Sequence, residues 1–409
     1  MDYTANDGTV SSVAAIVSAM ASTQDASLTE RVERIALAIA AGWTERLVEE
    51  HVAIVRIPAQ TGHEVERGKY LSARWRALGI DDAHFDSVNN VVGRIPGNSG
   101  GPRLLMEANM DTIYEDADCE PRREGDRLVG PGVWMNASGI TTILGTVAAL
   151  REAKIELPGD LIVAATVGEE AGGRFRGMRQ LVDDWGGRVD AILSIGNIPG
   201  SAHHRTLCRV AHEVTVRTGG GHSYGNLGVP SAVHVLIDIA QGYLSVALPD
   251  EPKTSTNVGV FRGGDAPNSI ASHAVAVFET RSPDPTLIAR VEETLRLLVS
   301  EAGTRPGVQA TLAEIDRSPF GMIEDDHPLV QIVYESHRRR GLKIFSMPVN
   351  CDADVALAAG IPTVVHGGAV GGFHHSPREF LESGSLVTGV QSLLTTVALF
   401  MERYQPPPA

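Results

Sequence analysis

The segment Leu161–Glu170, with the sequence LIVAATVGEE, constrains the fold of this chain more than any other. A short, nearly continuous apolar run rich in valine and isoleucine is typical of a strand buried on both faces of a helix-covered parallel sheet. Ligands bind in the crevice outside the carboxyl ends of such strands, so Glu169 and Glu170 are expected where chemistry takes place. Two adjacent acids after a strand also occur in solvated turns, so this prediction requires other segments that converge on the same place.

Composition excludes several classes of protein. The length of 409 residues predicts two domains, or one domain with a large insertion. With 43% hydrophobic and 21% charged residues, the chain is expected to be globular. It has no apolar run of about 18 residues, so it is not expected to span a membrane. The net charge of -15 disfavours nucleic acid and anionic membrane surfaces as partners, because binding to phosphates needs clustered cations.

The chain also lacks several local signals. Residues 1–24 are small, polar and alanine-rich, and we interpret them as a loosely attached extension. They lack the basic start and apolar core of a secretory signal, so a cytoplasmic location is expected. The three cysteines, Cys119, Cys208 and Cys351, have no paired spacing such as C-x-x-C, which argues against a disulfide framework and against a zinc finger.

The order of predicted elements indicates two kinds of architecture. Strands alternate with helices up to about Arg205 and again after Pro319, which predicts a mostly parallel sheet covered by helices. Between them, Arg209–Asp316 follows the order βαββαβ, a ferredoxin-like unit that is complete in itself and is interpreted as an inserted domain. The strands predicted outside the insertion are Asn90–Ile95, Arg103–Glu107, Leu161–Val167, Ala191–Ile195 and Thr363–His366.

Six segments carry a resemblance to a known family. They are Ala108–Thr112 (ANMDT), Gly130–Gly139 (GPGVWMNASG), Gly168–Glu170, Gly219–Ser223 (GGGHS), Thr280–Ser282 following Asn268, and Gly371–Ser376 (GGFHHS). In order and spacing they resemble the zinc-dependent exopeptidases and deacylases of the peptidase M20 type, which include glutamate carboxypeptidase, acetylornithine deacetylase, aminoacylase and peptidase T. The resemblance covers about Thr44 to Tyr404.

The resemblance implies a catalytic domain in two chain segments, 25–205 and 318–409, with an inserted lid and dimerisation domain at 206–317. It also implies a homodimer that pairs through the lid, with hinges near residues 205 and 318. Closure of the lid would bring Arg281 over Glu169 and exclude water.

The family's metal positions depart from its pattern in this sequence. Members hold two zinc ions with five protein ligands, but Asn109 stands at the first ligand histidine and Met135 at the bridging aspartate. Gly196 stands at a further acidic ligand, and only Glu170 and His375 are still of ligand type. Zinc normally needs at least three protein ligands, and amide and thioether groups are poor substitutes. The sequence therefore predicts no zinc pair and no other cofactor.

Other functional positions are retained. The resemblance assigns Glu169 as the general base and Asp111 as the carboxylate that orients the missing histidine. It assigns His222 as the lid histidine that stabilises the oxyanion in a partner subunit's site, and Arg281 as the clamp for a substrate carboxylate. Further candidates are His375 for acid–base chemistry and, for substrate binding, Asn109, Trp134, Asn268 and His374.

Each candidate has a simpler interpretation. Arg281 could pair with a surface acid, and His222 could be an exposed loop residue. Asn109 could be only a tolerated polar residue at a lost ligand position, whereas an amide beside Asp111 can also bind a substrate carbonyl or amine. His375 is open to three interpretations: a residual metal ligand, an acid or base, or a satisfied surface residue. Met135 is interpreted as filling the volume that the zinc ions occupy in the family, with Trp134 narrowing the pocket.

Three hypotheses of function follow. The first is a metal-independent enzyme, suited to a specialised biosynthetic step, that acts on the amide bond of a small carboxylated N-acyl amino acid or peptide-like metabolite by hydrolysis or acyl transfer. The second is a single-zinc hydrolase rebuilt around Glu170 and His375 with Asp111 or His374; Asp352 and Asp354 are interpreted as structural or substrate-facing. The third is a non-catalytic protein that binds a carboxylated metabolite or regulates an active relative.

Overall fold

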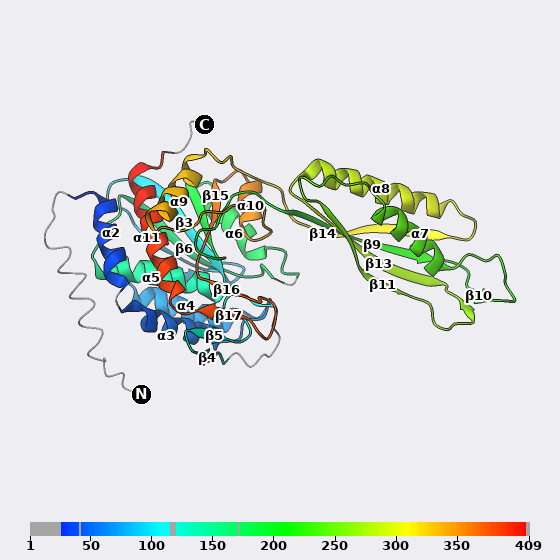
Figure 1. Cartoon of the computed structure of the whole chain (residues 1–409), viewed down its shortest axis with the longest axis horizontal. Coiled ribbons are helices and arrows are strands. Elements are labelled where there is room, and N and C mark those ends of the chain that lie inside the picture. Colours follow the sequence, from blue (N-terminus) through cyan, green and yellow to red (C-terminus); the bar gives the residue numbers. More distant parts are fainter. Residues whose placement is uncertain (1–25, 41, 115–119, 171, 406–409) are drawn as a thin grey trace. The chain divides into compact units, whose positions relative to one another are not determined.

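The computed structural model describes residues 26–40, 42–114, 120–170 and 172–405. These residues form two compact units (Figure 1). Unit 1 comprises the described residues up to His204, together with Gly321–Met347 and those from Cys351 onward. Unit 2 comprises Arg205–Phe320 and Pro348–Asn350. The predicted extension at 1–24 and Cys119 lie outside the described residues.

The centre of unit 1 is a seven-stranded sheet. Its strands lie in the order β1 (His84–Phe85), β2 (Val91–Ile95), β6 (Gly159–Thr166), β3 (Gly101–Asn109), β7 (Ala191–Ile195), β15 (Thr363–His366) and β8 (Ala202–His203). The inner strands β6, β3, β7 and β15 are parallel to one another, and β2 and β8 join them antiparallel at either side. The prediction of a mostly parallel sheet is confirmed.

The strand β6 is buried on both faces, as its sequence predicts. Leu161 and Val163 belong to the apolar cluster on one face of the sheet, whereas Ile162 and Ala164 belong to the cluster on the other. Because both faces are covered, every position needs an apolar side chain, and the usual alternation of polar and apolar residues disappears. Each large apolar side chain buried in this way stabilises the fold by about 1.5–3 kcal/mol.

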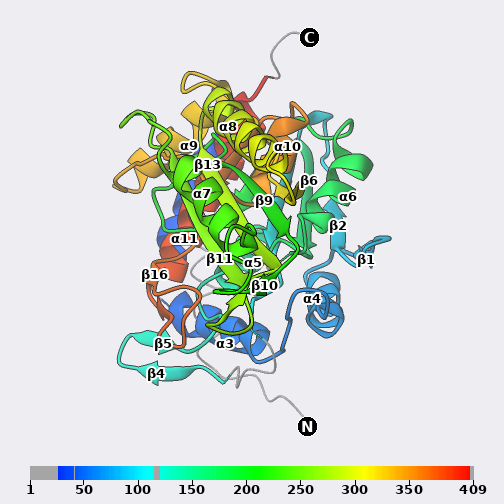
Figure 2. The same cartoon turned by 90° about the vertical axis from the view of Figure 1, so that its right-hand side faces the viewer.

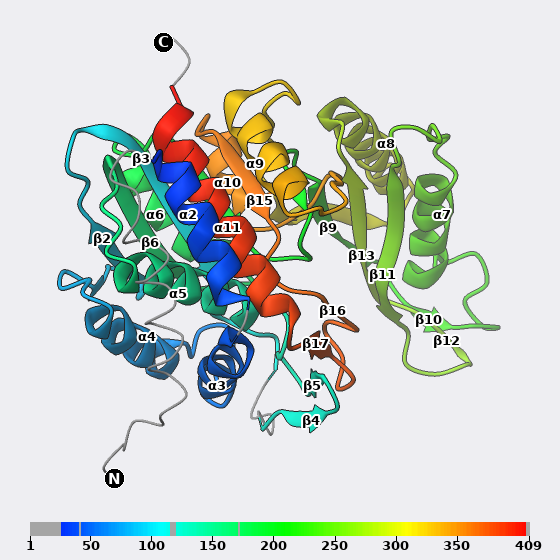
Figure 3. The ribbon, with the colours of Figure 1, turned by 60° about the vertical axis from the view of Figure 1, so that its left-hand side comes forward.

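Helices cover both faces of this sheet. Figure 3 shows the helices α2 and α11 side by side across one face. The helices that contribute to the cluster on that face are α2 (Leu28–Ile39), α3 (Trp43–Val55), α4 (Val65–Ala77), α5 (Ala137–Glu152), α9 (Pro328–Arg339) and α11 (Ser385–Arg403). The other face packs against α6 (Arg176–Trp185) and α10 (Ala353–Ala358). By length and composition α11 could cross a membrane, but 78% of its apolar window is buried inside the structure, as in the core helix of a packed domain.

A second, small sheet brings two loops of unit 1 together. It consists of β16 (Gly371–Gly372), β17 (Phe380–Glu382), β5 (Arg127–Val129) and β4 (Arg122–Glu124), in that order. The pairing of Phe380 with Val129 fixes the register of β17 against β5. The loop after β5 and the loop between β16 and β17 therefore start from neighbouring strands.

Unit 2 has the ferredoxin-like topology that the sequence predicts. Its sheet is antiparallel in the order β11 (Ser255–Gly263), β13 (His273–Ser282), β9 (Cys208–Arg217) and β14 (Gln309–Arg317). The helices α7 (Ala232–Leu244) and α8 (Pro285–Gly303) share an apolar cluster with one face of this sheet (Figure 2). A short pair, β10 (Gly221–His222) with β12 (Ser269–Ile270), extends from it.

Candidate active site

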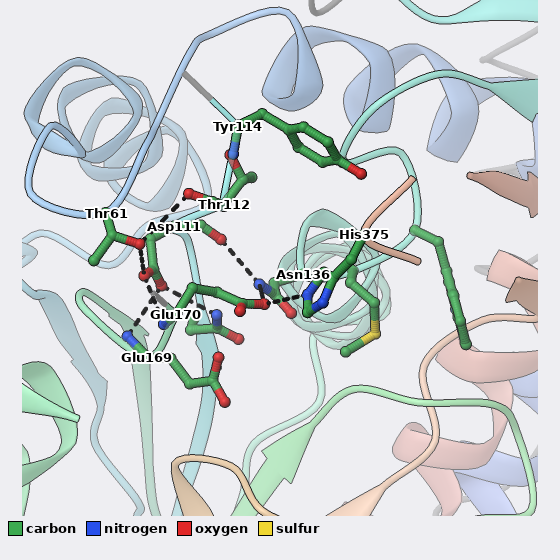
Figure 4. A network of polar contacts seen from close by, with 12 residues as sticks. Thr61, Asp111, Thr112, Tyr114, Asn136, Glu169, Glu170 and His375 are labelled. Carbon is green, nitrogen blue, oxygen red and sulfur yellow. Dashed lines mark hydrogen bonds and ion pairs between the residues drawn. The ribbon is translucent and has the colours of Figure 1, made fainter. Parts of the chain in front are cut away.

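The carboxyl ends of three parallel strands carry the candidate residues of unit 1. Asn109 ends β3, Glu169 and Glu170 follow β6, and Gly196 follows β7. Because these strands are parallel neighbours, their ends meet at one edge of the sheet. Figure 4 shows the polar network that joins several of these segments.

Asp111 is the fixed point of this network. Its carboxylate is fully buried and accepts hydrogen bonds from Thr61 Oγ1 at 2.9 Å and from Asn109 Nδ2 at 3.1 Å. It also accepts from the backbone N–H groups of Glu169 at 3.2 Å and Glu170 at 2.9 Å. Burial raises the pKa of Asp111, and these hydrogen bonds oppose the rise. Asp111 therefore holds the turn that carries both glutamates, with the amide of Asn109 where the resemblance places a histidine.

Asn136, Glu170 and His375 extend the network from three loops. Asn136 Nδ2 donates to the carbonyl oxygen of Asp111 at 2.9 Å and lies 3.5 Å from Glu170 Oε1. His375 Nε2 lies 3.1 Å from the same Glu170 oxygen, and this bond raises the pKa of His375 (Figure 4). Sequence reasoning did not single out Asn136, although it lies inside the GPGVWMNASG motif next to Met135.

Glu169 differs from its neighbour in having no donor for its side chain among the described residues. Only its backbone N–H is bonded, to Asp111. Burial, followed by the charges of Glu170 and Asp352, raises the pKa of the Glu169 carboxyl well above its usual range. A carboxyl with a raised pKa can hold a proton near neutral pH and release it to a basic leaving group, which suits acid–base chemistry.

Two further carboxyls are buried next to Thr166, at the end of β6. The Thr166 hydroxyl lies 3.2 Å from Glu107 Oε2 and 2.7 Å from Asp352 Oδ2, and these acids are 0% and 2% exposed. Burial raises the pKa of Glu107 to about 7 and that of Asp352 well above its usual range. Asp352 and Asp354 are both buried, so neither side chain is available to solvent.

Glu379 joins the loops on either side of the network. Its Oε1 accepts from the backbone N–H groups of Trp134 at 2.8 Å and Met135 at 2.9 Å, and its Oε2 accepts from that of Gly132 at 3.1 Å and from the Tyr114 hydroxyl at 3.3 Å. The carboxylate is fully buried. It thereby fastens the loop of Met135 to the loop that carries His375. Sequence reasoning missed Glu379, and its position four residues after His375 was the only signal.

Replacing Glu379 by glutamine is expected to lower the free energy of unfolding by about 1.5–3 kcal/mol, because an amide offers one acceptor oxygen where the carboxylate offers two. Urea unfolding followed by circular dichroism measures this change. The matched control is Glu382→Gln, which removes an ion pair to Arg127 with a side chain 37% exposed and should change stability by less than about 0.5 kcal/mol. Equal effects of the two substitutions would contradict the role of Glu379 in joining the two loops.

The remaining candidate residues of unit 1 lie on the two loops that Glu379 joins. Met135 is half-buried and packs against the main apolar core. Trp134 is 7% exposed, donates from Nε1 to Ala369 O at 2.8 Å, and meets the ring of His374 edge-on at 5.9 Å. The rings of His374 and His375 are 5.0 Å apart, and both side chains are exposed.

Three predicted residues belong to unit 2 instead. His222 is exposed, and its Nδ1 accepts from the backbone N–H groups of Tyr224 at 3.3 Å and Gly225 at 3.2 Å. A neutral His222 therefore carries its hydrogen on Nε2, where it can act as a donor. Asn268 is exposed, and its backbone carbonyl oxygen accepts a hydrogen bond from the backbone N–H of Ser223 at 2.9 Å.

Arg281 has a carboxylate partner within its own strand. Its guanidinium donates to both oxygens of Glu279, at 2.8 and 3.0 Å. A substrate carboxylate at Arg281 would have to displace this bidentate pair.

The donor set of the network does not fit a zinc pair. Asn109, Met135 and Gly196 stand at three positions where the resembled family has ligands, and none of them is a zinc ligand of the usual type. Within the described part of the chain, three or more His, Cys, Asp or Glu donors lie within 4.8 Å of one another only at His212, Glu292 and Glu314. That group lies in unit 2, where Arg317 already bonds to both glutamates.

Comparisons with known proteins agree with the family resemblance and with the fold. Residues 105–399 match peptidase family M20/M25/M40. The uncharacterized protein YqjE of Bacillus subtilis is 23% identical over 340 residues, or 78% of this chain and 89% of that protein. Carboxypeptidase G2 of Pseudomonas sp. is 28% identical over 228 residues, or 52% of this chain and 54% of that enzyme. The structure of a tripeptidase from Staphylococcus aureus superposes with a TM-score of 0.78 and 21% identity, covering 88% of this chain and 99% of its own.

Proposed function

Because this chain belongs to peptidase family M20/M25/M40, whose members act on C–N bonds of peptides and acyl amino acids, we propose that it cleaves an amide bond without the family's zinc pair. The substrate is a small carboxylated N-acyl amino acid or peptide-like metabolite. The observation that supports this proposal is that one network retains the acid–base carboxyl but lacks most of the metal ligands. Glu169 keeps its carboxyl at the end of β6, whereas Asn109, Met135 and Gly196 remove the metal ligands around it.

Glu169 acts as the general base and then as the general acid. Its carboxylate takes one proton from a water molecule or from a substrate amine, and the oxygen or nitrogen so freed forms a bond to the carbonyl carbon. The C–N bond then breaks, and the leaving nitrogen takes the proton back from Glu169. Hydrolysis and acyl transfer share this proton balance and differ only in the nucleophile.

Neutral and cationic donors replace the polarising role that zinc has in the family. The amide of Asn109 and the Nε2–H of His222 are donors suited to a carbonyl oxygen that gains negative charge. His375 next to Glu170 supplies a further proton donor. Arg281 binds the substrate carboxylate after releasing Glu279, and this exchange lowers the net gain from the clamp.

Turnover after metal removal tests the proposal. A panel of N-acyl amino acids and dipeptides is incubated with protein dialysed against a chelator, and the released amines are measured by liquid chromatography. We expect cleavage at an unchanged rate with chelator or added zinc. Loss of all activity on chelation would contradict the proposal in favour of a rebuilt single-zinc site, and binding of the panel without turnover would favour a non-catalytic protein.

We further propose that the protein forms a homodimer through unit 2. Both edge strands of its sheet carry a bulge, but their charges differ: β14 carries the charged Glu314, Asp316 and Arg317, whereas β11 exposes Phe261 and has Arg262 as its one charged residue. An open, weakly charged edge strand favours pairing with another chain. Sedimentation velocity should give a dimer for the native chain and a monomer for Phe261→Asp. The matched control, Ile315→Asp on β14, is 39% exposed against 41% for Phe261 and should remain dimeric.

A further inference from the structure

The network at the end of β6 keeps the acids that surround the metal position in the resembled family but supplies almost no positive charge to them. Asp111, Glu169 and Glu170 lie on neighbouring segments. Within the described part of the chain, the groups that bond to their side chains are hydroxyl, amide and backbone N–H groups together with His375. No lysine or arginine side chain of the described residues bonds to any of these carboxylates. The charge that metal ions balance in the resembled family is therefore balanced here either by protonation of the carboxyls or by a further cationic group.

The carboxylate oxygens that lack a donor mark the place where a further cationic group would bind. Both oxygens of Asp111 accept hydrogen bonds, and Glu170 Oε1 accepts from His375 and Asn136. Glu170 Oε2 and both side-chain oxygens of Glu169 have no donor among the described residues. The Glu170 side chain is only 11% exposed, so solvent can reach it only in part. Three carboxylate oxygens of adjacent residues thus remain open for donors from a ligand.

Buried acids add to the negative potential at the same place. Glu107 and Asp352 are 0% and 2% exposed, and each has one carboxylate oxygen that no described residue contacts through a hydrogen bond. Both act on the electrostatics of Glu169. The whole chain carries a net charge of -15, which favours the approach of cations over a long range.

On the basis of the function proposed above, we propose that the substrate carries a primary ammonium group, which the carboxylates of Glu169 and Glu170 bind at the position where the resembled family holds metal. An ammonium has three N–H donors, and the network leaves three acceptor oxygens open. Charge-assisted hydrogen bonds of this kind are about twice as strong as neutral ones. Because the substrate proposed above also carries a carboxylate, the expected substrate is zwitterionic.

The bound ammonium also suits acyl transfer. It gives one proton to Glu169 and becomes a neutral amine, whose lone pair forms the new C–N bond at the carbonyl carbon. As the old C–N bond breaks, the leaving nitrogen takes that proton from Glu169. The Glu169 carboxylate then takes the second proton from the nitrogen of the new amide and passes it to the released amine, which leaves as an ammonium ion. No oxidant, metal or further reactant is needed to balance the step.

Binding of simple cations to the full chain tests the inference. The probes are butylammonium, trimethylbutylammonium, which has the charge but no N–H group, and the neutral pentan-1-ol. Affinities are measured by ligand-observed nuclear magnetic resonance at low ionic strength. We expect butylammonium to bind at least tenfold more tightly than either other probe. Equal binding of the three probes would overturn the proposal.

Variants locate the binding to the network. Glu169→Gln and Glu170→Gln should each weaken butylammonium binding at least tenfold, whereas Glu169→Asp, which keeps the charge, should retain most of it. The control is Glu66→Gln, which removes an exposed acid paired with Lys69 and should leave binding unchanged. Unchanged affinity in Glu169→Gln and Glu170→Gln, with melting curves like the native one, would overturn the assignment. Binding is read without turnover, so a protein that binds butylammonium but cleaves no amide rejects the proposed function alone.

Discussion

Glu169→Gln is expected to lower kcat on an amide substrate by about 10²–10⁴-fold, the usual contribution of a positioned general acid–base group. Glutamine keeps the size of the side chain but can neither accept nor return the proton. KM should change less, because the other groups proposed to bind substrate remain. Steady-state kinetics on the substrate found in the panel measures both constants. Native kcat in Glu169→Gln would reject Glu169 as the base.

The pH dependence gives the same test a second readout. Burial and neighbouring carboxylates raise the pKa of Glu169, so the base form is scarce at low pH and becomes common only as the pH rises through that raised value. The native kcat/KM should therefore increase with pH across this range, and the residual activity of Glu169→Gln should lose this limb. Glu66→Gln, on the exposed surface, serves as the control and should keep the native profile.

Restoring the ligands is expected to restore zinc binding. The triple variant Asn109→His, Met135→Asp and Gly196→Asp would complete a five-ligand set with Glu170 and His375. Room for the new aspartate exists, because a Cβ added at Gly196 meets no atom within 4 Å. At free zinc about 100-fold above Kd, binding stabilises a protein by about 2.7 kcal/mol, which for a chain of this length corresponds to a rise in Tm of about 3–5 °C. The native chain should show no rise.

The other cluster of zinc-type ligands in the described part of the chain must be disabled before this measurement. His212, Glu292 and Glu314 in unit 2 could take up zinc by displacing Arg317. Both proteins are therefore compared in a Glu314→Gln background, by differential scanning calorimetry with and without zinc. An equal rise in Tm in the native and triple-variant proteins would show that the native network already holds metal.

The sequence predicted the architecture because long, strongly patterned elements determine it. The apolar run of β6 has no face that tolerates solvent, so it is recognisable as a doubly covered strand. In unit 2, β9 alternates between buried and half-buried positions along Cys208–Arg217, which identifies a sheet covered on one face. The short strands β4, β5, β16 and β17 were not predicted, because each has only two or three residues and no periodicity to detect.

The site was predicted as a set of positions rather than as a set of contacts. The motifs identified Asp111, Glu169, Glu170 and His375, and the structure joins all four directly through hydrogen bonds of Asp111 and Glu170. Sequence could not show that Arg281 pairs with Glu279, because the two are ordinary neighbours in an alternating strand. Thr61 was missed for a similar reason: only the folding of distant loops brings its hydroxyl to Asp111.

The hydrogen bonds of Asp111 also bear on how such a site can change over time. Its carboxylate is held by Thr61, by Asn109 and by two backbone N–H groups, none of which requires an ion. The turn that carries Glu169 and Glu170 is thus held without a metal ion, so these hydrogen bonds do not depend on the residues at the other ligand positions. A site of this kind is evolvable because the fold of its turn does not depend on the metal ligands that surround it.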